Sequence, residues 1–324
     1  MASKVLMEAL SPTMEEGRLV EWKKNEGDPI RIGDVIAEVE TDKAVMELVA
    51  RAEGVLLKQL VPAGSTVAVA KLVGIVGQSG EDITALLAID QVVNSAAKMR
   101  YMSGGQVGCP IVFRGPGGSA LQLAAQHSQS FESWYAHIPG LKVLTPGTPA
   151  DAKGLLKSAI RDDDPVVFIE GEMLYNVKGE VPDGEHLVPI GKAEVKRAGA
   201  DVTLVCHSKT VTVALKAADL LAEEGISAEV VDLRTIRPLD TDTILNSVGR
   251  THRCVVVEEG WVFAGVGAQV VDVIQQHVFD ELDAPVLRVT GADVPMPYNK
   301  QLERASKADP AKVVAAVKRV LYLA

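Results

Sequence analysis

The sequence places a lysine and a histidine in settings where each could do chemistry. Lys43 lies between two β-forming runs, 35–39 and 45–50, so we expect it at the tip of a hairpin. A lysine there is a solvated cation unless a group is attached to its amine. His127 follows a glycine-rich stretch at 115–118, which lets backbone approach a ligand. Its imidazole can transfer a proton near neutral pH, although a structural role is the simpler interpretation.

The residues that flank Lys43 form an internal repeat that ends near Val76. A shift of 37 residues aligns four pairs of similar residues: Gly17 with Gly54, Gly27 with Gly64, Ile30 with Val67 and Ile36 with Val73. Two similar halves built from short strands therefore meet at Lys43. Such a repeat predicts a pseudo-twofold β-sandwich, which buries alternating apolar residues and leaves its central hairpin in water.

The residues around the lysine resemble a known family. Two segments, Glu8-Ala9-Leu10-Ser11-Pro12-Thr13-Met14 and Glu40-Thr41-Asp42-Lys43-Ala44, resemble the lipoyl domains of 2-oxo acid dehydrogenase complexes. Biotin carriers share this fold but resemble Met-Lys-Met at the tip, so lipoate is favoured over biotin. The resemblance implies lipoate bound covalently to Lys43. A long arm on a rigid hairpin can then visit separate active sites.

Composition excludes several classes of function. The chain has 324 residues, of which 47% are hydrophobic and 23% charged, as expected for two or three globular domains. Its net charge of −10 provides no basic stripe for nucleic acid and disfavours an anionic membrane surface. No apolar run reaches the roughly 18 residues needed to span a bilayer. The first expected strand begins at Lys4, which leaves no room for a signal peptide, so we expect a cytoplasmic protein.

The cysteines indicate neither a metal site nor a disulfide framework. Cys109, Cys206 and Cys254 are widely separated in the sequence. We therefore expect three thiols in or near the core.

After residue 88 the sequence alternates between expected strands and helices. The expected strands are 111–113, 143–144, 166–170, 202–206, 228–233, 254–257 and 286–289. The expected helices are 83–97, 149–160, 211–224, 241–248, 266–277 and a last one from residue 311. Thr148 is a suitable cap for the second helix, whose first residue is Pro149. This alternation predicts a parallel sheet with right-handed crossovers and helices on both faces.

The same part of the chain resembles a second family. The matching runs are 89–98, 101–106, 110–116, 125–129 and 138–143, and they resemble the beta subunit of the pyruvate dehydrogenase component. Residues 231–240, 258–261 and 291–298 resemble the transketolase-type C-terminal domain of that family. The resemblance implies a multidomain fold in which an all-β lipoyl-type sandwich precedes α/β transketolase-like domains with parallel sheets. We expect a lipoyl domain at 1–80, a partial pyrimidine-binding domain at 81–182 and the C-terminal domain at 183–324.

The pyrimidine-binding domain is incomplete when set against this family. In the family, several strands and helices precede the helix that contains residues 89–91, and here they are absent. The absent half also carries the family's glutamate that bonds the aminopyrimidine ring, and nothing in 81–91 matches it. Either the gene fuses a carrier to a truncated subunit, or the sequence lacks an internal segment.

The resemblance implies roles for three side chains of the middle domain. The family histidine that matches His127 faces the thiamine cleft and assists transfer of the acyl group to lipoamide, because imidazole can protonate a dithiolane sulfur as it opens. Tyr101 and Arg114 flank the cleft in the family, with ordinary packing and ion pairing as the alternatives. His137 is expected to order the loop at 139–140 and is not a catalytic candidate.

Three consecutive aspartates follow the expected helix 149–160. Negative charge is disfavoured at a helix C-terminus, and a solvated turn is the simple interpretation. The matching turn in the family resembles a potassium site. The resemblance implies ligands from the carbonyls of Ile111 and Ala159 and from Asp162 and Asp164, since oxygen donors suit a hard cation.

The family's diphosphate and magnesium motif, a Gly-Asp-Gly followed by paired asparagines, does not occur in the sequence. The resemblance therefore implies an α2β2 assembly in which the alpha subunit holds magnesium and shares thiamine diphosphate. The implied reaction is oxidative decarboxylation of pyruvate with transfer of acetyl to lipoamide, for a dihydrolipoamide acetyltransferase core. Two alternatives stay open: a non-catalytic lipoyl carrier or assembly protein with a degenerate thiamine site, and a beta subunit for acetoin or another 2-oxo acid. The runs at 101–105 and 138–140 favour pyruvate as the substrate.

Overall fold

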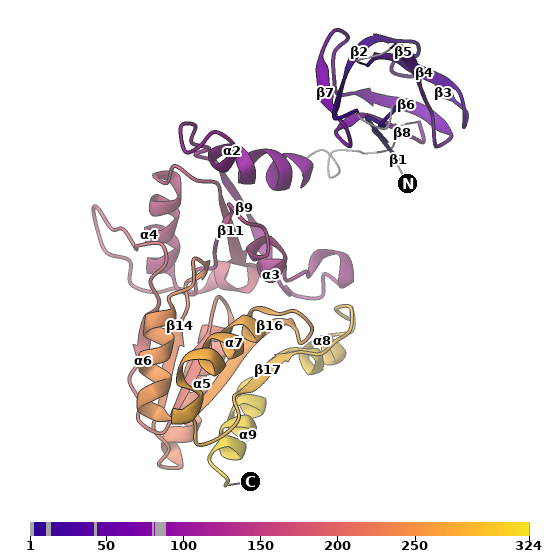
Figure 1. Ribbon diagram of the computed structural model, residues 1–324. Coiled ribbons are helices and arrows are strands. Elements are labelled where there is room, and N and C mark those ends of the chain that lie inside the picture. The colour runs from indigo at the N-terminus through magenta and orange to yellow at the C-terminus, as the bar shows by residue number, and fades with distance from the viewer. Residues whose placement is uncertain (1–2, 11–13, 42–43, 80, 82–88, 324) are drawn as a thin grey trace. The chain divides into compact units, whose positions relative to one another are not determined.

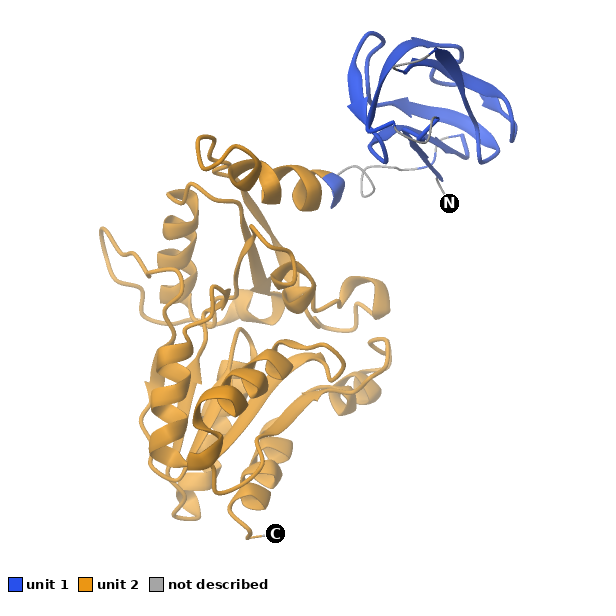
Figure 2. Cartoon of the chain, viewed as in Figure 1, with its two compact units in different colours: residues 1–90 blue, residues 91–324 orange. Residues whose placement is uncertain are grey.

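The chain divides into two compact units. The computed structural model describes residues 3–10, 14–41, 44–79, 81 and 89–323. Unit 1 is Met1–Asp90 and unit 2 is Gln91–Ala324 (Figure 2). Unit 2 thus includes most of both expected α/β domains, and the boundaries expected at 80 and 182 stay predictions.

Unit 1 is a β-sandwich (Figure 1). Its strands are β1 (Ser3–Leu6), β2 (Glu16–Trp22), β3 (Pro29–Ile30), β4 (Val35–Glu40), β5 (Val45–Val49), β6 (Gly54–Gln59), β7 (Thr66–Ala68) and β8 (Leu72–Gly77). They form two four-stranded sheets with the orders β1-β8-β6-β3 and β5-β4-β2-β7. If each strand of the first sheet is replaced by the strand four places later, counting on from β1 after β8, the order of the second sheet results. This confirms the predicted pseudo-twofold arrangement.

Residues related by the repeat occupy equivalent places in the two halves. Ile36 on β4 and Val73 on β8 are both fully buried in the core of the sandwich. Gly27 and Gly64 precede β3 and β7, and their φ angles of 96° and 89° lie in the left-handed region that favours glycine. The repeat therefore preserves both the core positions and the turns between the strands.

Unit 2 consists of two sheets with helices around them (Figure 1). Its strands are β9 (Val112–Gly117), β10 (Lys142–Leu144), β11 (Val166–Gly171), β12 (Glu194–Arg197), β13 (Val202–Cys206), β14 (Ala228–Asp232), β15 (Thr235–Arg237), β16 (Cys254–Trp261) and β17 (Leu287–Gly291). The α-helices are α2 (Ala97–Met102), α3 (Glu132–Ala136), α4 (Pro149–Ile160), α5 (Thr210–Glu223), α6 (Thr241–Thr251), α7 (Val266–Val278), α8 (Lys300–Ser306) and α9 (Pro310–Val320). The other helical segments are η1 (Gln91–Ala96), η2 (Ala125–His127), η3 (Glu172–Asn176) and η4 (Phe279–Glu281).

The start of α4 and the segment around η1 can be compared with the helices predicted from the sequence. Thr148 caps α4 by accepting a hydrogen bond from the Asp151 N–H at 3.2 Å, and Pro149 is the first helical residue, so this prediction is confirmed. The helix expected over 83–97 lies partly outside the described residues. In the described part of this expected helix, residues 91–96 form the π-helix η1, which leads into α2.

The larger sheet of unit 2 has the order β12-β14-β13-β16-β17. The last four strands of this order are parallel, and Val202 on β13 lies opposite Ala228 on β14. β12 pairs antiparallel with β14 and was not predicted, because its sequence is short and mostly charged. The predicted parallel sheet is therefore confirmed with one antiparallel strand added at its edge.

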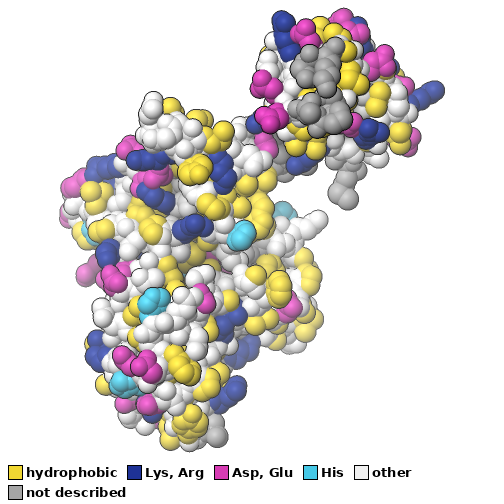
Figure 3. Space-filling view, in the orientation of Figure 1, with side chains coloured by type: hydrophobic (Ala, Val, Ile, Leu, Met, Phe, Trp, Pro, Cys, Tyr) yellow, Lys and Arg dark blue, Asp and Glu magenta, His cyan; other side chains and the backbone are white. Residues whose placement is uncertain are grey.

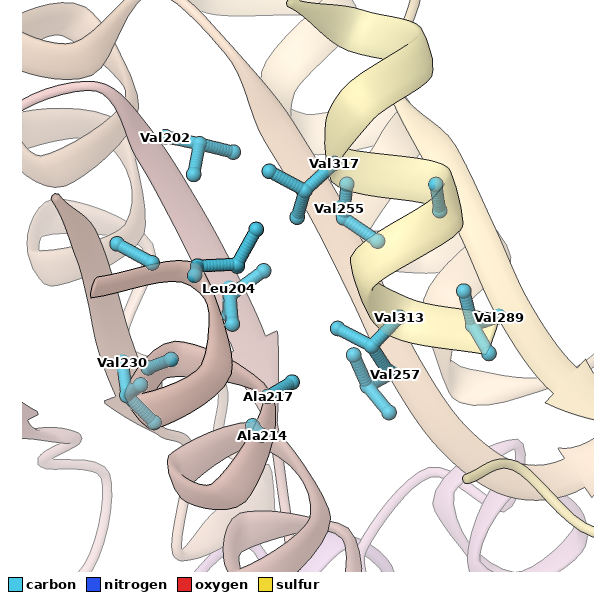
Figure 4. Close-up of a cluster of buried hydrophobic side chains, with 14 of the residues drawn as sticks. Val202, Leu204, Ala214, Ala217, Val230, Val255, Val257, Val289, Val313 and Val317 are labelled. Carbon is cyan, nitrogen blue, oxygen red and sulfur yellow. The ribbon is translucent and has the colours of Figure 1, made fainter. Parts of the chain in front are cut away.

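Helices cover both faces of this sheet, as predicted. On one face, α5 and α9 pack against side chains such as Leu204 and Val255, which are fully buried (Figure 4). On the other face, α6 and α7 pack against Val205 and Val256, the next residues along the same strands. Consecutive strand residues point to opposite faces, so a strand buried on both sides is apolar throughout.

The smaller sheet has the order β15-β10-β11-β9. β9, β10 and β11 are parallel, whereas β15 is antiparallel to β10, with Val143 opposite Arg237. β15 follows β14 in the sequence, so a strand from the second half of unit 2 completes the sheet of the first half. Among the described residues, no strand pairs with the outer edge of β9.

The burial of the cysteines and the mixture of charges on the surface can be compared with what the sequence predicted. Cys109, Cys206 and Cys254 are free and buried, which confirms that they are core thiols. On the face drawn in Figure 3, acidic and basic side chains are interspersed with apolar ones. Within the described part of the chain, no helix has the length and apolar character that crossing a bilayer requires.

The core around β13 gives a stability prediction. Leu204→Ala removes a fully buried side chain and leaves a cavity, so we expect the free energy of unfolding to fall by about 2–5 kcal/mol. Leu220→Ala is the control, because Leu220 on α5 is 44% exposed and its loss should change stability by no more than about 0.5 kcal/mol. Urea unfolding of the full chain measures both variants. Equal midpoints for the two would contradict the packing described here.

Candidate functional site

The hairpin of β4 and β5 frames the lysine predicted to be a carrier. Glu40 lies opposite Val45, and the Thr41 N–H donates to the Ala44 carbonyl at 2.9 Å. The Thr41 hydroxyl donates to the same carbonyl at 2.9 Å, so the two described ends of the turn are bound together. Lys43 lies outside the described residues, and its role as a lipoate attachment site stays a prediction.

His127 lies in η2, on the segment that joins β9 to α3, and it is exposed. The Gly118 N–H donates to the Gln129 carbonyl at 2.7 Å, which brings the two ends of residues 118–129 together. We call these residues the His127 loop. Gly118 has a φ angle of 72°, so the glycine-rich stretch singled out in the sequence does form the turn that opens this loop.

Tyr101 lies at the end of α2, and its side chain is 88% exposed. It lines a cavity of about 430 Å³ together with residues that include Arg100, Lys142 and Pro238. Nothing holds the phenol in the core, so Tyr101 is available to a ligand or to another chain.

Arg114 lies on β9 and forms an ion pair with Glu170 on the neighbouring strand β11, at 2.9 Å. The Tyr175 hydroxyl donates to the other oxygen of Glu170 at 3.0 Å. The hydrogen bond to Glu170 and the charge of its carboxylate raise the pKa of Arg114. Arg114 also lines an apolar cavity of about 330 Å³ with Phe113 and Tyr135. The ion pair is the alternative that the sequence left open, and contact with a ligand stays a prediction.

The structure does not bring the three residues expected at one cleft around a single one of these cavities. The two cavities are lined by different residues, so Tyr101 and Arg114 do not share one, and His127 lines neither. Their placement at one cleft stays a prediction.

The acidic turn after α4 is balanced by two cations of the same unit. The Lys142 ammonium lies 2.6 Å from Asp162 and 3.1 Å from Asp164, and Arg100 lies 3.0 Å from Asp164. Partial burial tends to raise the pKa of Asp164, but Lys142 and Arg100 outweigh it, so the pKa lies below its ordinary value. The unfavourable charge at the helix end is thus neutralised by side chains.

The oxygens implied as potassium ligands already have partners. The Ile111 carbonyl accepts from the Val166 N–H at 2.9 Å, and the Ala159 carbonyl accepts from the Asp162 N–H at 3.3 Å. An ion at Asp162 and Asp164 would have to displace the Lys142 ammonium. No group of three His, Cys, Asp or Glu in the described part of the chain could hold a metal. Potassium binding stays a prediction.

The structure brings together a largely buried polar cluster that was not predicted. The Ser119 N–H and hydroxyl both donate to Glu259 on β16, the former at 2.8 Å. Lys209, just after β13, donates to the Ser119 carbonyl at 2.6 Å and lies 2.5 Å from Glu259. These residues lie at or near the carboxyl ends of parallel strands from both sheets, the edge where α/β folds place ligands.

Two buried titratable groups lie beside this cluster. Burial raises the pKa of Glu132, the first residue of α3, to about 7, and the nearby carboxylates of Glu259 and Glu258 add to the effect. Burial lowers the pKa of His207 to about 4, and neither ring nitrogen has a hydrogen-bond partner among the described residues. His207 is therefore neutral at pH 7.

The sequence contained a weak signal for this cluster. Lys209 and Glu259 come a few residues after the expected strands 202–206 and 254–257, where functional side chains of α/β folds gather. Nothing in the sequence indicated that Ser119, which is 140 residues before Glu259, faces the same edge.

Three protein families match consecutive parts of the chain. Residues 3–76 match the family described as biotin-requiring enzyme. Residues 81–178 match the pyrimidine-binding domain of transketolase, and residues 191–313 match its C-terminal domain. Together they span the sandwich and both sheets of unit 2, which confirms the fold class expected from the sequence.

Relatives match along the whole chain. A pyruvate dehydrogenase E1 component subunit beta of Rhizobium meliloti (strain 1021) is 38% identical over 459 residues, which cover 99% of this chain and 100% of the relative. A mitochondrial subunit of the same name from Dictyostelium discoideum is 54% identical over 240 residues, which cover 73% of this chain and 67% of the relative. Because this chain has only 324 residues, more than a hundred residues of the Rhizobium relative have no counterpart in it. This agrees with the absent segment inferred from the sequence.

A solved structure is also similar. It is a split gene transketolase described as an inactive beta4 tetramer, with a TM-score of 0.60 and 27% sequence identity. The match covers 74% of this chain and 73% of that one.

The buried carboxyl of Glu132 gives a pH prediction. A pKa raised from 4.5 to about 7 on folding stabilises the protein below pH 4.5, and this contribution is lost as the pH rises through 7. Between pH 5 and 8, the free energy of unfolding should therefore fall by up to about 3 kcal/mol more in the unmodified chain than in Glu132→Gln.

Urea unfolding of the full chain at the two pH values makes this measurement. His207 and Asp232 also titrate abnormally, but they are present in both proteins and their contributions cancel. Glu223→Gln, at an exposed position on α5, is the control. The same pH dependence in Glu132→Gln as in the unmodified chain would show that Glu132 does not titrate in this range.

Proposed function

The chain belongs to the family of pyruvate dehydrogenase E1 component beta subunits, and on that basis we propose that it acts with an alpha subunit in the oxidative decarboxylation of pyruvate. The acetyl group then passes to lipoamide. The observation that carries the proposal is the match to a beta subunit along 99% of the chain, with lipoyl-type and transketolase-type domains together. Pyruvate is preferred because the relatives are named for it.

Thiamine diphosphate, when bound, supplies the ring that stabilises the carbanion and accepts its electrons. The residues present fit only one wall of a site for it. Phe113 and Tyr135 line an apolar cavity that suits a flat ring, but the family's glutamate for the aminopyrimidine has no counterpart. We infer that an alpha subunit contributes the rest of the site, including the magnesium and diphosphate ligands that are absent from this sequence.

Within this chain, the proposed roles fall to a few side chains. His127 is exposed on its loop, where the imidazole can give a proton to the dithiolane sulfur as the acetyl group is transferred. Tyr101 and Arg114 would contact ligand or the alpha subunit at the mouth of the cleft. The potassium ligands implied at Ile111, Ala159, Asp162 and Asp164 belong to this proposal as well.

We propose that lipoate is attached to Lys43 and that the partners are an alpha subunit, in an α2β2 assembly, and a dihydrolipoamide acetyltransferase core. A carrier on the same chain raises the effective concentration of lipoyl groups near the cleft, provided that the arm can reach it. The sequence has almost no linker between the two expected domains, which limits this reach.

A second candidate is a non-catalytic lipoyl carrier or assembly protein. It is favoured by the more than a hundred residues of the Rhizobium relative that have no counterpart in this chain. It is also favoured because Tyr101 and Arg114 line different cavities and His127 lines neither. A beta subunit for acetoin or another 2-oxo acid is the third candidate.

The decisive experiment is turnover by the chain purified together with an alpha subunit from the same genome. We expect pyruvate to reduce an artificial electron acceptor only when thiamine diphosphate and magnesium are present. A panel with acetoin and branched-chain 2-oxo acids separates the candidate substrates. A soluble complex without turnover, whose intact mass shows a lipoyl group, would favour the carrier instead.

The role of His127 predicts unequal losses in the two half-reactions. In His127→Ala, acetylation of lipoyl-Lys43 should slow by about 100-fold, and reduction of the artificial acceptor should slow much less, because only the first needs the proton. Mass spectrometry follows the acetylated lipoyl group. His137→Ala, at another exposed histidine of unit 2, is the matched control. Equal losses in both half-reactions of His127→Ala would exclude this role.

A further inference from the structure

The His127 loop has few bonds of its own. Besides the hydrogen bond that closes its base, the Gln129 side chain donates to the Ala125 carbonyl at 3.0 Å. Leu121, Leu123 and His127 are exposed, and Ala120, which is buried, is a small side chain, so apolar packing contributes little to holding the middle of the loop. Whatever holds the imidazole in place must reach the loop from elsewhere in unit 2.

The first such anchor comes from the larger sheet. Glu259 on β16 accepts two hydrogen bonds from Ser119, and Lys209 bonds the Ser119 carbonyl. The side chains of Lys209 and Glu259 are only 12% and 14% exposed, and Ser119 is 2% exposed. Hydrogen bonds to charged partners are stronger than those between neutral groups, and here they are shielded from water.

Gly118 shows how closely the loop passes this ion pair. A Cβ atom at Gly118 would lie 2.6 Å from a Glu259 oxygen and 2.7 Å from the Lys209 nitrogen. The φ angle of 72° also disfavours any other residue there. The backbone is thus in direct contact with the pair at the first turn of the loop.

The second anchor comes from α8, near the end of the chain. Glu303 is 4% exposed and accepts a hydrogen bond from the Gln122 N–H at 3.0 Å. Lys307 lies 2.9 Å from the other oxygen of Glu303, which holds the carboxylate in position. The Gln122 side chain also donates to the Tyr298 carbonyl at 3.4 Å. A buried carboxylate aimed at one backbone N–H fixes the middle of the loop.

We propose that Glu259, with Lys209, and Glu303 are positioning residues that hold the His127 loop for acetyl transfer. The inference rests on the role proposed for His127. All three side chains come from residues after β13, so the C-terminal region of the chain would contribute to the reaction. They touch the loop and act through it, since their hydrogen bonds go to Ser119 and Gln122. A small displacement of the imidazole is enough to slow proton transfer strongly.

The test combines these anchors with the histidine in double variants. Glu259→Gln keeps the size of the side chain and removes its charge, which weakens the contacts with Ser119 and Lys209. In the chain purified with its alpha subunit, we expect Glu259→Gln to slow acetylation of lipoyl-Lys43 about tenfold, and pyruvate-dependent reduction of the artificial acceptor clearly less. In a His127→Ala background the same change should cost less than about twofold, because the loop then carries no imidazole to misplace.

A structural readout separates this proposal from the proposed function. Hydrogen exchange of residues 119–129 in the full chain should become at least tenfold faster in Glu259→Gln, and unchanged in the control Glu223→Gln. If His127→Ala alone leaves acetylation unaffected, the role of His127 fails, and the exchange rates still decide whether Glu259 holds the loop. Glu303→Gln repeats both measurements at the second anchor and replaces Glu259→Gln if that variant does not fold.

Two results would overturn the inference. One is unchanged exchange of residues 119–129 in both Glu259→Gln and Glu303→Gln. The other is an equal loss of acetylation with and without His127, which would mean that the carboxylates affect the protein independently of the imidazole.

Discussion

The antiparallel pairing of β15 with β10 is the contact on which the arrangement of unit 2 depends. The chain leaves the larger sheet after β14 and forms β15, which completes the smaller sheet with Arg237 opposite Val143. Arg237 also donates to the Ala136 carbonyl at the end of α3 at 2.5 Å. Because backbone pairing fixes strands to within a residue, the carboxyl ends of strands from both sheets come to face one another.

That facing edge explains why so many charges are buried there. Taking Lys209 and Glu259 out of water costs free energy, and their mutual attraction offsets this only when further hydrogen bonds satisfy both groups. Ser119 supplies those bonds from the other sheet. Glu132 lies in the same region, where burial keeps its carboxyl largely protonated below pH 7. The buried charges at this edge therefore bond the His127 loop at Ser119.

The chain thus joins a lipoyl-type sandwich to an α/β unit whose two halves depend on each other. In the first unit, a repeat of similar strands sets the central hairpin of β4 and β5 at the junction of the two halves of the repeat, β1–β4 and β5–β8. In the second, β15 from the C-terminal half completes the smaller sheet, and side chains of the larger sheet bond the His127 loop. Among the described residues, β9 is an unpaired edge of the smaller sheet. Unpaired edges are places where another chain can add a strand.

The sequence by itself determined the features that depend on neighbours along the chain. The cap at Thr148 and the apolar strands of the larger sheet were predicted because caps and strand patterns involve residues a few positions apart. The 37-residue repeat was predicted because two similar stretches can be aligned from the sequence alone. Only the tertiary structure decided that Lys142 neutralises Asp162, that β15 crosses between sheets, and that Ser119 meets Glu259. These contacts join residues 20 to 140 positions apart, and no local pattern records which distant side chain a buried charge will meet.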